Sequence, residues 1–166
     1  MTSYRYLLFA IATLLLSNSL LLQAEARQES LSEVDQAFMA SQRKAINTLA
    51  RRHFGRQLTG QKSNDFPLLQ RLLDERRVSN QDIKTLQAMG IIFGDIIAKE
   101  QALQWTIYID KYGRSRALAI PKQRDVLFPV TMISRRVQSG ASVNIEELYQ
   151  KALKSTQFIR QQIVVY

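Results

Sequence analysis

The stretch LQWTIYIDKYGRSRALAI, residues 103–120, decides the fold class. In its first half an apolar residue occupies every second position, which is the period of a strand with one buried face. The DKYG sequence at 110–113 is typical of a tight turn, because glycine readily adopts a positive φ. We therefore expect strand 103–110 to pair antiparallel with a second strand at 114–120. Four side chains should face the core: Leu103, Trp105, Ile107 and Ile109.

On both sides of this hairpin the apolar period changes to that of helices. Helices are expected from Ser30 to Phe54, Asp65 to Arg77, Ser79 to Lys99, Pro129 to just before Gly140, and from Asn144 onward. A short third strand at 126–128 is one option for completing the sheet. The order is three helices, two or three strands and two helices. This order predicts an α+β fold with helices flanking a small antiparallel hairpin or three-stranded sheet.

Local signals refine the expected helices. In the first, the inward stripe is predicted to be Leu31, Val34, Phe38, Ala45 and Leu49. Asp65 should cap the second helix, and Ser79 with Asp82 is a capping signal for the third. Gly90 and Gly94 lie one turn apart in that third helix, which allows another backbone to approach closely. No strand precedes these glycines and no Gly-Lys-Ser/Thr follows them, so they do not form a phosphate-binding loop.

Residues 1–26 match the three parts of a secretory signal peptide. Arg5 supplies the positive charge, Leu7–Leu22 is mostly apolar, and Ala24 and Ala26 are small residues at a cleavage site. The apolar run of about 16 residues is shorter than the roughly 20 that span a bilayer. Cleavage after Ala26 is therefore favoured over a retained membrane anchor, and the product is expected in the periplasm or outside the cell, with no integral membrane span.

The remaining residues, 27–166, have a length that suits a single α+β domain, with a helical part at 27–80 and a second part at 81–166. The absence of cysteine excludes thiol catalysis, disulfides and cysteine metal sites. The formal net charge is +9, which favours anionic partners. For an exported protein these are anionic envelope components or acidic proteins rather than nucleic acid. The same charge could also serve solubility alone.

Six basic residues form the candidate anion-binding set: Arg51, Arg52 and Arg56 at the end of the first helix, and Lys111, Arg114 and Arg116 in the hairpin. Should the two groups meet on one surface, they would make an anion-binding face. Should they lie apart, they would act as solubilising charge. Replacing Arg114 and Arg116 with alanine should weaken binding without much loss of stability, because exposed charges contribute little to folding.

Asp95 and Asp110 are the candidate functional carboxylates. Asp95 interrupts an apolar run and either turns outward or needs an inward partner, for which Arg114, Arg116 or Arg136 is available. A carboxylate pair is the machinery of a hydrolase acting on a polymer. The single histidine, His53, lies among arginines that would repel a metal ion. We therefore expect no metal or cofactor, and we favour a protein that is not an enzyme.

The ordered series from residue 86 to residue 151 resembles a bacterial family, domain of unknown function 3806. The resemblance is carried by GIIFGD at 90–95, Trp105, DKYGR at 110–114, LFP at 127–129, Met132-Ile133, Arg136, Gly140, Val143-Asn144-Ile145 and Leu148-Tyr149. It implies a shared fold and no particular activity. The resulting hypothesis is a small basic exported protein, a non-enzymatic envelope accessory or binding module for an anionic partner. The alternative is a small hydrolase that acts on an envelope polymer through paired carboxylates.

The first prediction concerns processing. Protein recovered from the cell envelope should begin at Arg27, because Ala24 and Ala26 present the small side chains that signal peptidase requires. N-terminal sequencing measures this directly. Replacing Ala26 with tyrosine should leave the precursor intact, whereas replacing it with serine should not. An unmodified chain that still begins at Met1 in the envelope would contradict the prediction.

Overall fold

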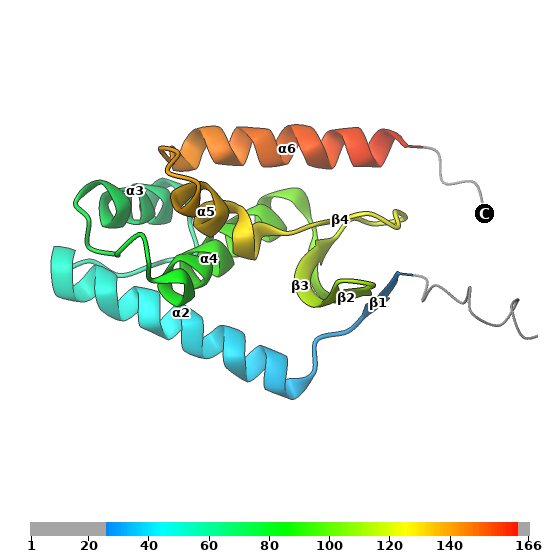
Figure 1. The fold of residues 1–166 in the computed structure, drawn as a ribbon, viewed down its shortest axis with the longest axis horizontal. Coiled ribbons are helices and arrows are strands. Elements are labelled where there is room, and N and C mark those ends of the chain that lie inside the picture. Colours follow the sequence, from blue (N-terminus) through cyan, green and yellow to red (C-terminus); the bar gives the residue numbers. More distant parts are fainter. Residues whose placement is uncertain (1–25, 163–166) are drawn as a thin grey trace, which may run out of the picture.

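The computed structural model describes residues 26–162, so the expected signal sequence before Ala26 lies outside the described residues (Figure 1). The elements in chain order are β1 (Arg27–Glu29), α2 (Glu33–Phe54), α3 (Lys62–Asp74), α4 (Ile83–Gln101), β2 (Gln104–Asp110), β3 (Gly113–Ala119), β4 (Val126–Leu127), α5 (Pro129–Gln138) and α6 (Ile145–Gln161). This arrangement confirms the predicted α+β class, with helices before and after the hairpin.

The sheet has four antiparallel strands in the order β1-β2-β3-β4. The predicted hairpin is confirmed, with Trp105 opposite Leu118 and Asp110 opposite Gly113. Leu103 and Ile107 are buried, while Trp105 and Ile109 are partly buried. The optional third strand exists as β4, and β1 is an additional edge strand. No apolar alternation marks β1, because its three residues are polar and exposed.

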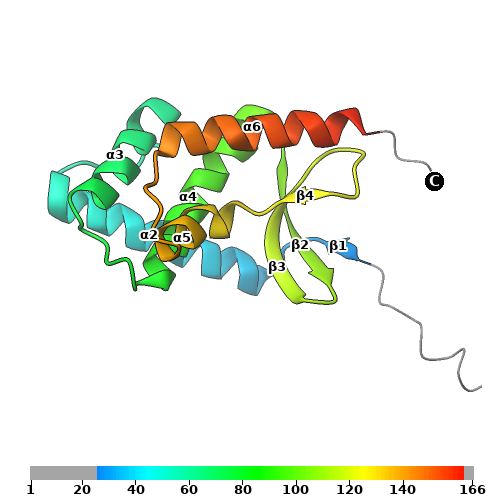
Figure 2. The same cartoon turned by 45° about the horizontal axis from the view of Figure 1, so that its top comes forward.

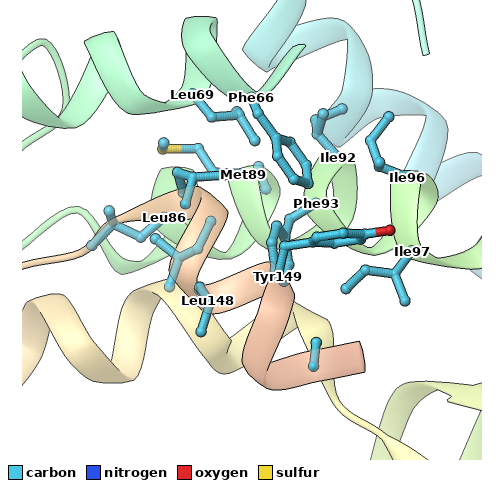
Figure 3. Close-up of a cluster of buried hydrophobic side chains, with 14 of the residues drawn as sticks. Phe66, Leu69, Leu86, Met89, Ile92, Phe93, Ile96, Ile97, Leu148 and Tyr149 are labelled. Atoms are coloured by element: carbon cyan, nitrogen blue, oxygen red, sulfur yellow. The ribbon is translucent and has the colours of Figure 1, made fainter. Parts of the chain in front are cut away.

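Helix α4 is the centre of the structure, and it lies between α2 and α6 in both views (Figures 1 and 2). Ten of its residues are buried, which explains its nearly continuous apolar sequence. Figure 3 shows side chains of α3, α4 and α6 meeting around Phe93. The ring centroid of Phe66 lies 5.6 Å from that of Phe93 and 5.4 Å from that of Tyr149. These aromatic contacts join the three helices at one point of the core.

Two predicted helix starts are wrong. Helix α3 begins at Lys62 rather than after Asp65, and the buried Asp65 carboxylate instead accepts hydrogen bonds from the backbone N–H groups of Thr59 and Gly60. Asp65 therefore fastens the preceding loop. Helix α4 is capped by Asp82, whose side chain accepts from the Thr85 N–H, and Ser79 lies outside the helix.

The predicted inward stripe of the first helix is displaced by one position, although its member Leu49 is partly buried against the core. Val34 is 78% exposed and Phe38 is 42% exposed. The buried positions of α2 are Asp35, Met39, Ile46 and Ala50. One residue corresponds to a rotation of about 100° around a helix axis. The rotation brings the carboxylate of Asp35 to the inner face and leaves Phe38 at the surface.

The two glycines of α4 allow α5 to pack closely, as their spacing predicts. A Cβ atom on Gly90 would lie 2.3 Å from the Val130 carbonyl oxygen. A Cβ atom on Gly94 would lie 2.6 Å from the Trp105 ring and 2.7 Å from Pro129. Glycine, which has no Cβ atom, is therefore the residue that fits at both positions. Its small size lets the start of α5 pack directly against α4. Between residues 26 and 162, no helix is long and apolar enough to cross a membrane.

The second prediction concerns this contact. Alanine normally stabilises a helix interior by up to about 1 kcal/mol relative to glycine. Gly90→Ala should instead lower the free energy of unfolding by about 2 kcal/mol, because the new methyl group meets the backbone of α5, which cannot move aside cheaply. Urea denaturation of the wild type and the variant measures the difference. A Gly90→Ala protein that is more stable than the wild type would show that α5 does not pack here.

Candidate anion-binding groove

A groove runs beside the hairpin between α2, α4 and α5, and we call it the hairpin groove. It consists of two adjoining cavities of about 420 Å³ and 460 Å³ that share Gln87, Arg116 and Val130. The other lining residues are Asp110, Tyr112, Arg114, Ser115, Phe128, Thr131 and Arg135 in the first cavity and Phe38, Gln42, Lys84, Ala88 and Ile91 in the second. The hairpin supplies one wall, and residues of α2, α4 and α5 supply the rest.

Two arginines of the hairpin are held in the groove by one buried carboxylate. Arg114 and Arg116 are two positions apart on β3, so their side chains leave the same face of the sheet. Asp35 accepts from Arg114 Nη1 at 2.9 Å and Nη2 at 2.5 Å, and from Arg116 Nη2 at 2.8 Å. The Asp35 side chain is 3% exposed, whereas those of Arg114 and Arg116 are 45% and 26% exposed. Both arginine side chains therefore contact Asp35 and remain partly exposed, although Arg116 Nε is buried without a hydrogen-bond partner among the described residues.

Asp35 is itself fixed by a capping box at the start of α2. The Ser32 hydroxyl donates to Asp35 Oδ2 at 2.6 Å, and the Asp35 N–H donates back to Ser32 Oγ at 3.2 Å. The hydrogen bonds from Arg114, followed by those from Ser32, hold the pKa of Asp35 well below its ordinary value despite burial. The carboxylate is thus ionised whenever the protein is folded at physiological pH. Arg114 and Arg116 consequently support the fold, which corrects the expectation that replacing them costs little stability.

The groove keeps a net positive charge even though the negative charge of Asp35 neutralises one of its cations. Four cationic side chains line it, namely Lys84, Arg114, Arg116 and Arg135. Opposing them are Asp110 in the lining and Asp35 beneath it. Arg135 is exposed and has no ion pair within residues 26–162. Lys111 lies at the hairpin tip, where its ammonium is 5.0 Å from the centre of the Tyr112 ring.

Aromatic side chains border the charged part of the groove. The Arg116 guanidinium carbon lies 4.1 Å from the centre of the Phe38 ring, which is a cation–π contact. Phe128 is 36% exposed and packs edge-on against Tyr108 at 5.5 Å. Tyr112 is 84% exposed at the turn. A ligand in the groove would therefore meet apolar rings as well as cations.

The two predicted groups of basic residues do not meet. Arg51 stands at the opposite end of α2 from Asp35, about 24 Å away at a rise of 1.5 Å per residue. Arg52 lies beside it and Arg56 donates to Asn64 Oδ1 in the following loop. The hairpin members Lys111, Arg114 and Arg116 belong to the groove or its rim, whereas Arg51, Arg52 and Arg56 form a separate basic end of the molecule.

The two candidate carboxylates also lie apart. Asp95 receives a bidentate contact from Arg43, at 2.7 Å and 2.8 Å, and the Trp105 indole N–H at 2.9 Å. Its partner is thus Arg43 rather than Arg114, Arg116 or Arg136. Asp110 accepts from the Tyr112 N–H and closes the hairpin turn. Since Asp95 and Asp110 line different cavities, nothing in their placement favours a paired-carboxylate hydrolase.

A further polar cluster lies where α3, α4 and α6 meet, and the sequence pattern does not reveal it. Lys62 pairs with Glu146 at 2.8 Å and lies 4.2 Å from the centre of the Tyr149 ring. The Tyr149 hydroxyl donates to Glu100, and burial together with this carboxylate raises the pKa of Tyr149 to about 12. In the described part of the chain, no group of three or more histidine, aspartate or glutamate side chains could hold a metal ion.

Comparison with known proteins gives a family and a fold. The family model described as "Domain of unknown function (DUF3806)" matches residues 65–149. A search of curated proteins finds no match. Among solved structures, a protein from Bacteroides thetaiotaomicron VPI-5482, with a crystal structure at 1.50 Å resolution, is similar with a TM-score of 0.72 and 19% sequence identity. The likeness covers 80% of this chain and 49% of that one, so this chain spans about half of that protein's length. At this identity the likeness concerns the fold alone.

The third prediction concerns Asp35. Because its pKa is lowered on folding, the ionised carboxylate stabilises the protein fully above its ordinary pKa near 3.9 and loses this effect as the pH falls through the lowered pKa. Asp35→Asn should therefore reduce the free energy of unfolding by about 2 kcal/mol at pH 7, since both arginines can still reach water. The difference from the wild type should shrink below pH 4. Urea titrations between pH 3 and 7 measure it.

Glu33→Gln is the matched control, because Glu33 is an exposed carboxylate in the same first turn of α2. It should change the free energy of unfolding by less than about 0.5 kcal/mol. Equal effects of Asp35→Asn and Glu33→Gln at pH 7 would contradict the central role of Asp35.

Proposed function

This chain belongs to the family described as Domain of unknown function (DUF3806), and from its geometry we propose that it binds an anionic partner through the hairpin groove. The family description names no activity, so the proposal rests on the groove itself. One observation carries it: Arg114 and Arg116 are held side by side on a buried carboxylate while parts of both remain exposed to the groove.

Fixing the two arginines in advance favours binding. A free arginine loses side-chain entropy when it engages a ligand, at a cost of about 0.5–1.5 kcal/mol for each side chain. Here Asp35 and the Phe38 ring have already restricted Arg116, and Asp35 has restricted Arg114. An arriving anion therefore meets donors that are already oriented. Arg135 also lines the groove, has no ion pair among the described residues, and adds a further positive charge for the ligand.

The role we propose for this activity is that of an exported accessory or binding module in the cell envelope, rather than an enzyme. Its support is the predicted signal peptide together with the net charge of +9. Partners of matching charge in that compartment are acidic proteins and anionic envelope components. The basic end around Arg52 is proposed to serve solubility, because it lies away from the groove.

The fourth prediction separates groove binding from a general effect of net charge. Arg135→Glu and Arg52→Glu change the net charge equally, but only Arg135 lines the groove. With inorganic polyphosphate as the anionic probe, Arg135→Glu should weaken binding roughly fivefold at 50 mM salt, and Arg52→Glu by less than roughly twofold. Raising the salt to 300 mM should weaken binding by the wild type and narrow the difference, because exposed charges are screened.

Isothermal titration calorimetry provides these affinities, and thermal denaturation verifies that both variants are folded. Equal loss in the two variants would assign binding to net charge and not to the groove. Salt-insensitive binding, or no binding of polyphosphate at 50 mM salt, would overturn the proposed function.

A further inference from the structure

We infer that the partner is an acidic polypeptide segment in extended conformation, which adds to the sheet as a strand along the open edge of β3. This inference rests on the proposed function of the hairpin groove and specifies the chemical class of its ligand. Strand addition of this kind takes affinity from backbone hydrogen bonds and specificity from alternate side chains. Four features of the structure support it: an open strand edge, the direction of its backbone groups, the charge around it and the space beside it.

The edge of β3 is open over most of its length. Strand β4 pairs with Leu118 and Ala119, and Ala117 beside them is fully buried. No strand of the described chain lies beside Gly113–Arg116 on that side. The reason is local. After Leu127 the chain reaches Pro129, which lacks an N–H and begins α5, so the backbone leaves the sheet. Figure 2 shows α5 starting directly after β4. No strand therefore continues the row of β4 beside Gly113–Arg116, the first four residues of β3.

The turn determines which backbone groups face this vacant row. Asp110 and Gly113 are opposite each other across a two-residue turn, so they form the hydrogen-bonded pair that closes the hairpin. Alternate residues of β3 then direct their N–H and C=O groups toward β2, as Ser115 and Ala117 do. Arg114 and Arg116 direct theirs away from β2. Leu118, which is in the same phase, is opposite Leu127 of β4.

The charge around the edge selects the kind of strand that can be added. The side chains of Arg114 and Arg116 belong to the edge itself, and Arg135 faces them from α5 across a cavity of about 420 Å³. A second copy of this edge would bring like charges together, which is a known protection against edge-to-edge association. An acidic strand would instead place carboxylates beside these guanidinium groups. The occupant is therefore a strand of opposite charge and not another copy of this chain.

The dimensions agree with a short peptide. Four residues of open edge correspond to about 13 Å of strand at 3.3–3.4 Å per residue. Successive side chains of an added strand point to opposite faces of the sheet. The side chains on one face would meet the arginines held by Asp35, and those on the other would meet Phe128, which packs on Tyr108. A segment that alternates acidic residues with small or apolar residues fits this arrangement.

The test uses amide hydrogen exchange, followed residue by residue by NMR. The probe is an eight-residue peptide in which glutamate and threonine alternate, and inorganic polyphosphate is the comparison ligand. Strand addition should slow exchange of the Arg114 and Arg116 amides at least tenfold, because they gain acceptors in the peptide. The Ser115 and Ala117 amides, already bonded to β2, should change less than twofold. Polyphosphate, which cannot form a strand, should leave all four amides within twofold of the free protein.

Modified peptides provide a second readout by fluorescence anisotropy. Two series of peptides carry N-methyl groups at every second residue: one series loses the backbone N–H groups that face β3, and the other loses those that face solvent. The series without the N–H groups that face β3 should bind at least tenfold more weakly than the unmodified peptide. The other series should bind within threefold of it. Arg135→Glu should weaken the unmodified peptide more than Arg52→Glu does.

The outcomes distinguish this inference from the proposed function. If polyphosphate and peptide both bind through Arg135 but the two N-methylated series bind equally and Arg114 and Arg116 stay unprotected, strand addition is overturned while anion binding in the groove stands. If polyphosphate binds through Arg135 and the peptide does not bind, the ligand is anionic but not a polypeptide strand. If neither probe binds, both proposals are overturned.

Discussion

The ion pairs between Asp35 and the two arginines of β3 are the interaction on which the rest of the groove depends. A buried carboxylate without partners would cost several kcal/mol, so α2 can present Asp35 inward only where β3 supplies Arg114 and Arg116. In return, the carboxylate fixes both guanidinium groups and ties the first turn of α2 to a strand about 80 residues later in the chain. The same contact thus supports the tertiary fold and sets the geometry of the candidate site.

The opposite wall of the groove depends on a steric constraint instead. Gly90 and Gly94 let the first turn of α5 rest directly on α4, which places Val130 and Thr131 beside the hairpin. A larger side chain at either glycine would move α5 and change the width of the groove. Pro129 starts the helix at this point and so takes the backbone away from the sheet. The close packing and the open strand edge therefore have a common origin in a few residues of α4 and α5.

Much of the fold follows from the sequence, because the hairpin alternation and the apolar stripe of α4 are strong periodic signals. The stripe of α2 shows where that reasoning fails. Their apolar side chains predict that Val34 and Phe38 face the core, yet the inner face of α2 carries Asp35 and Met39. The ion pairs that Asp35 forms with β3 override the usual preference of a carboxylate for the surface. The Ser32-x-x-Asp35 capping pattern is the signal that identifies the start of α2. Of the six basic candidates, the three in the hairpin lie at the groove and the three at the end of α2 do not. Sequence periodicity gives no distances between elements, so it cannot show that Arg51 lies far from Arg114 or that Asp95 pairs with Arg43.

The balance of charge in the groove explains why backbone geometry should matter to its ligand. If Arg114, Arg116, Arg135 and Lys84 were all unpaired, the groove would attract any polyanion with little discrimination. Asp35 neutralises part of that charge without releasing the arginines from the groove, so electrostatic attraction alone becomes weaker. In the strand addition that we propose, the backbone groups of the strand edge add affinity only for a ligand that can itself form a strand. A moderate positive charge beside an open edge is thus a more selective arrangement than a stronger charge would be.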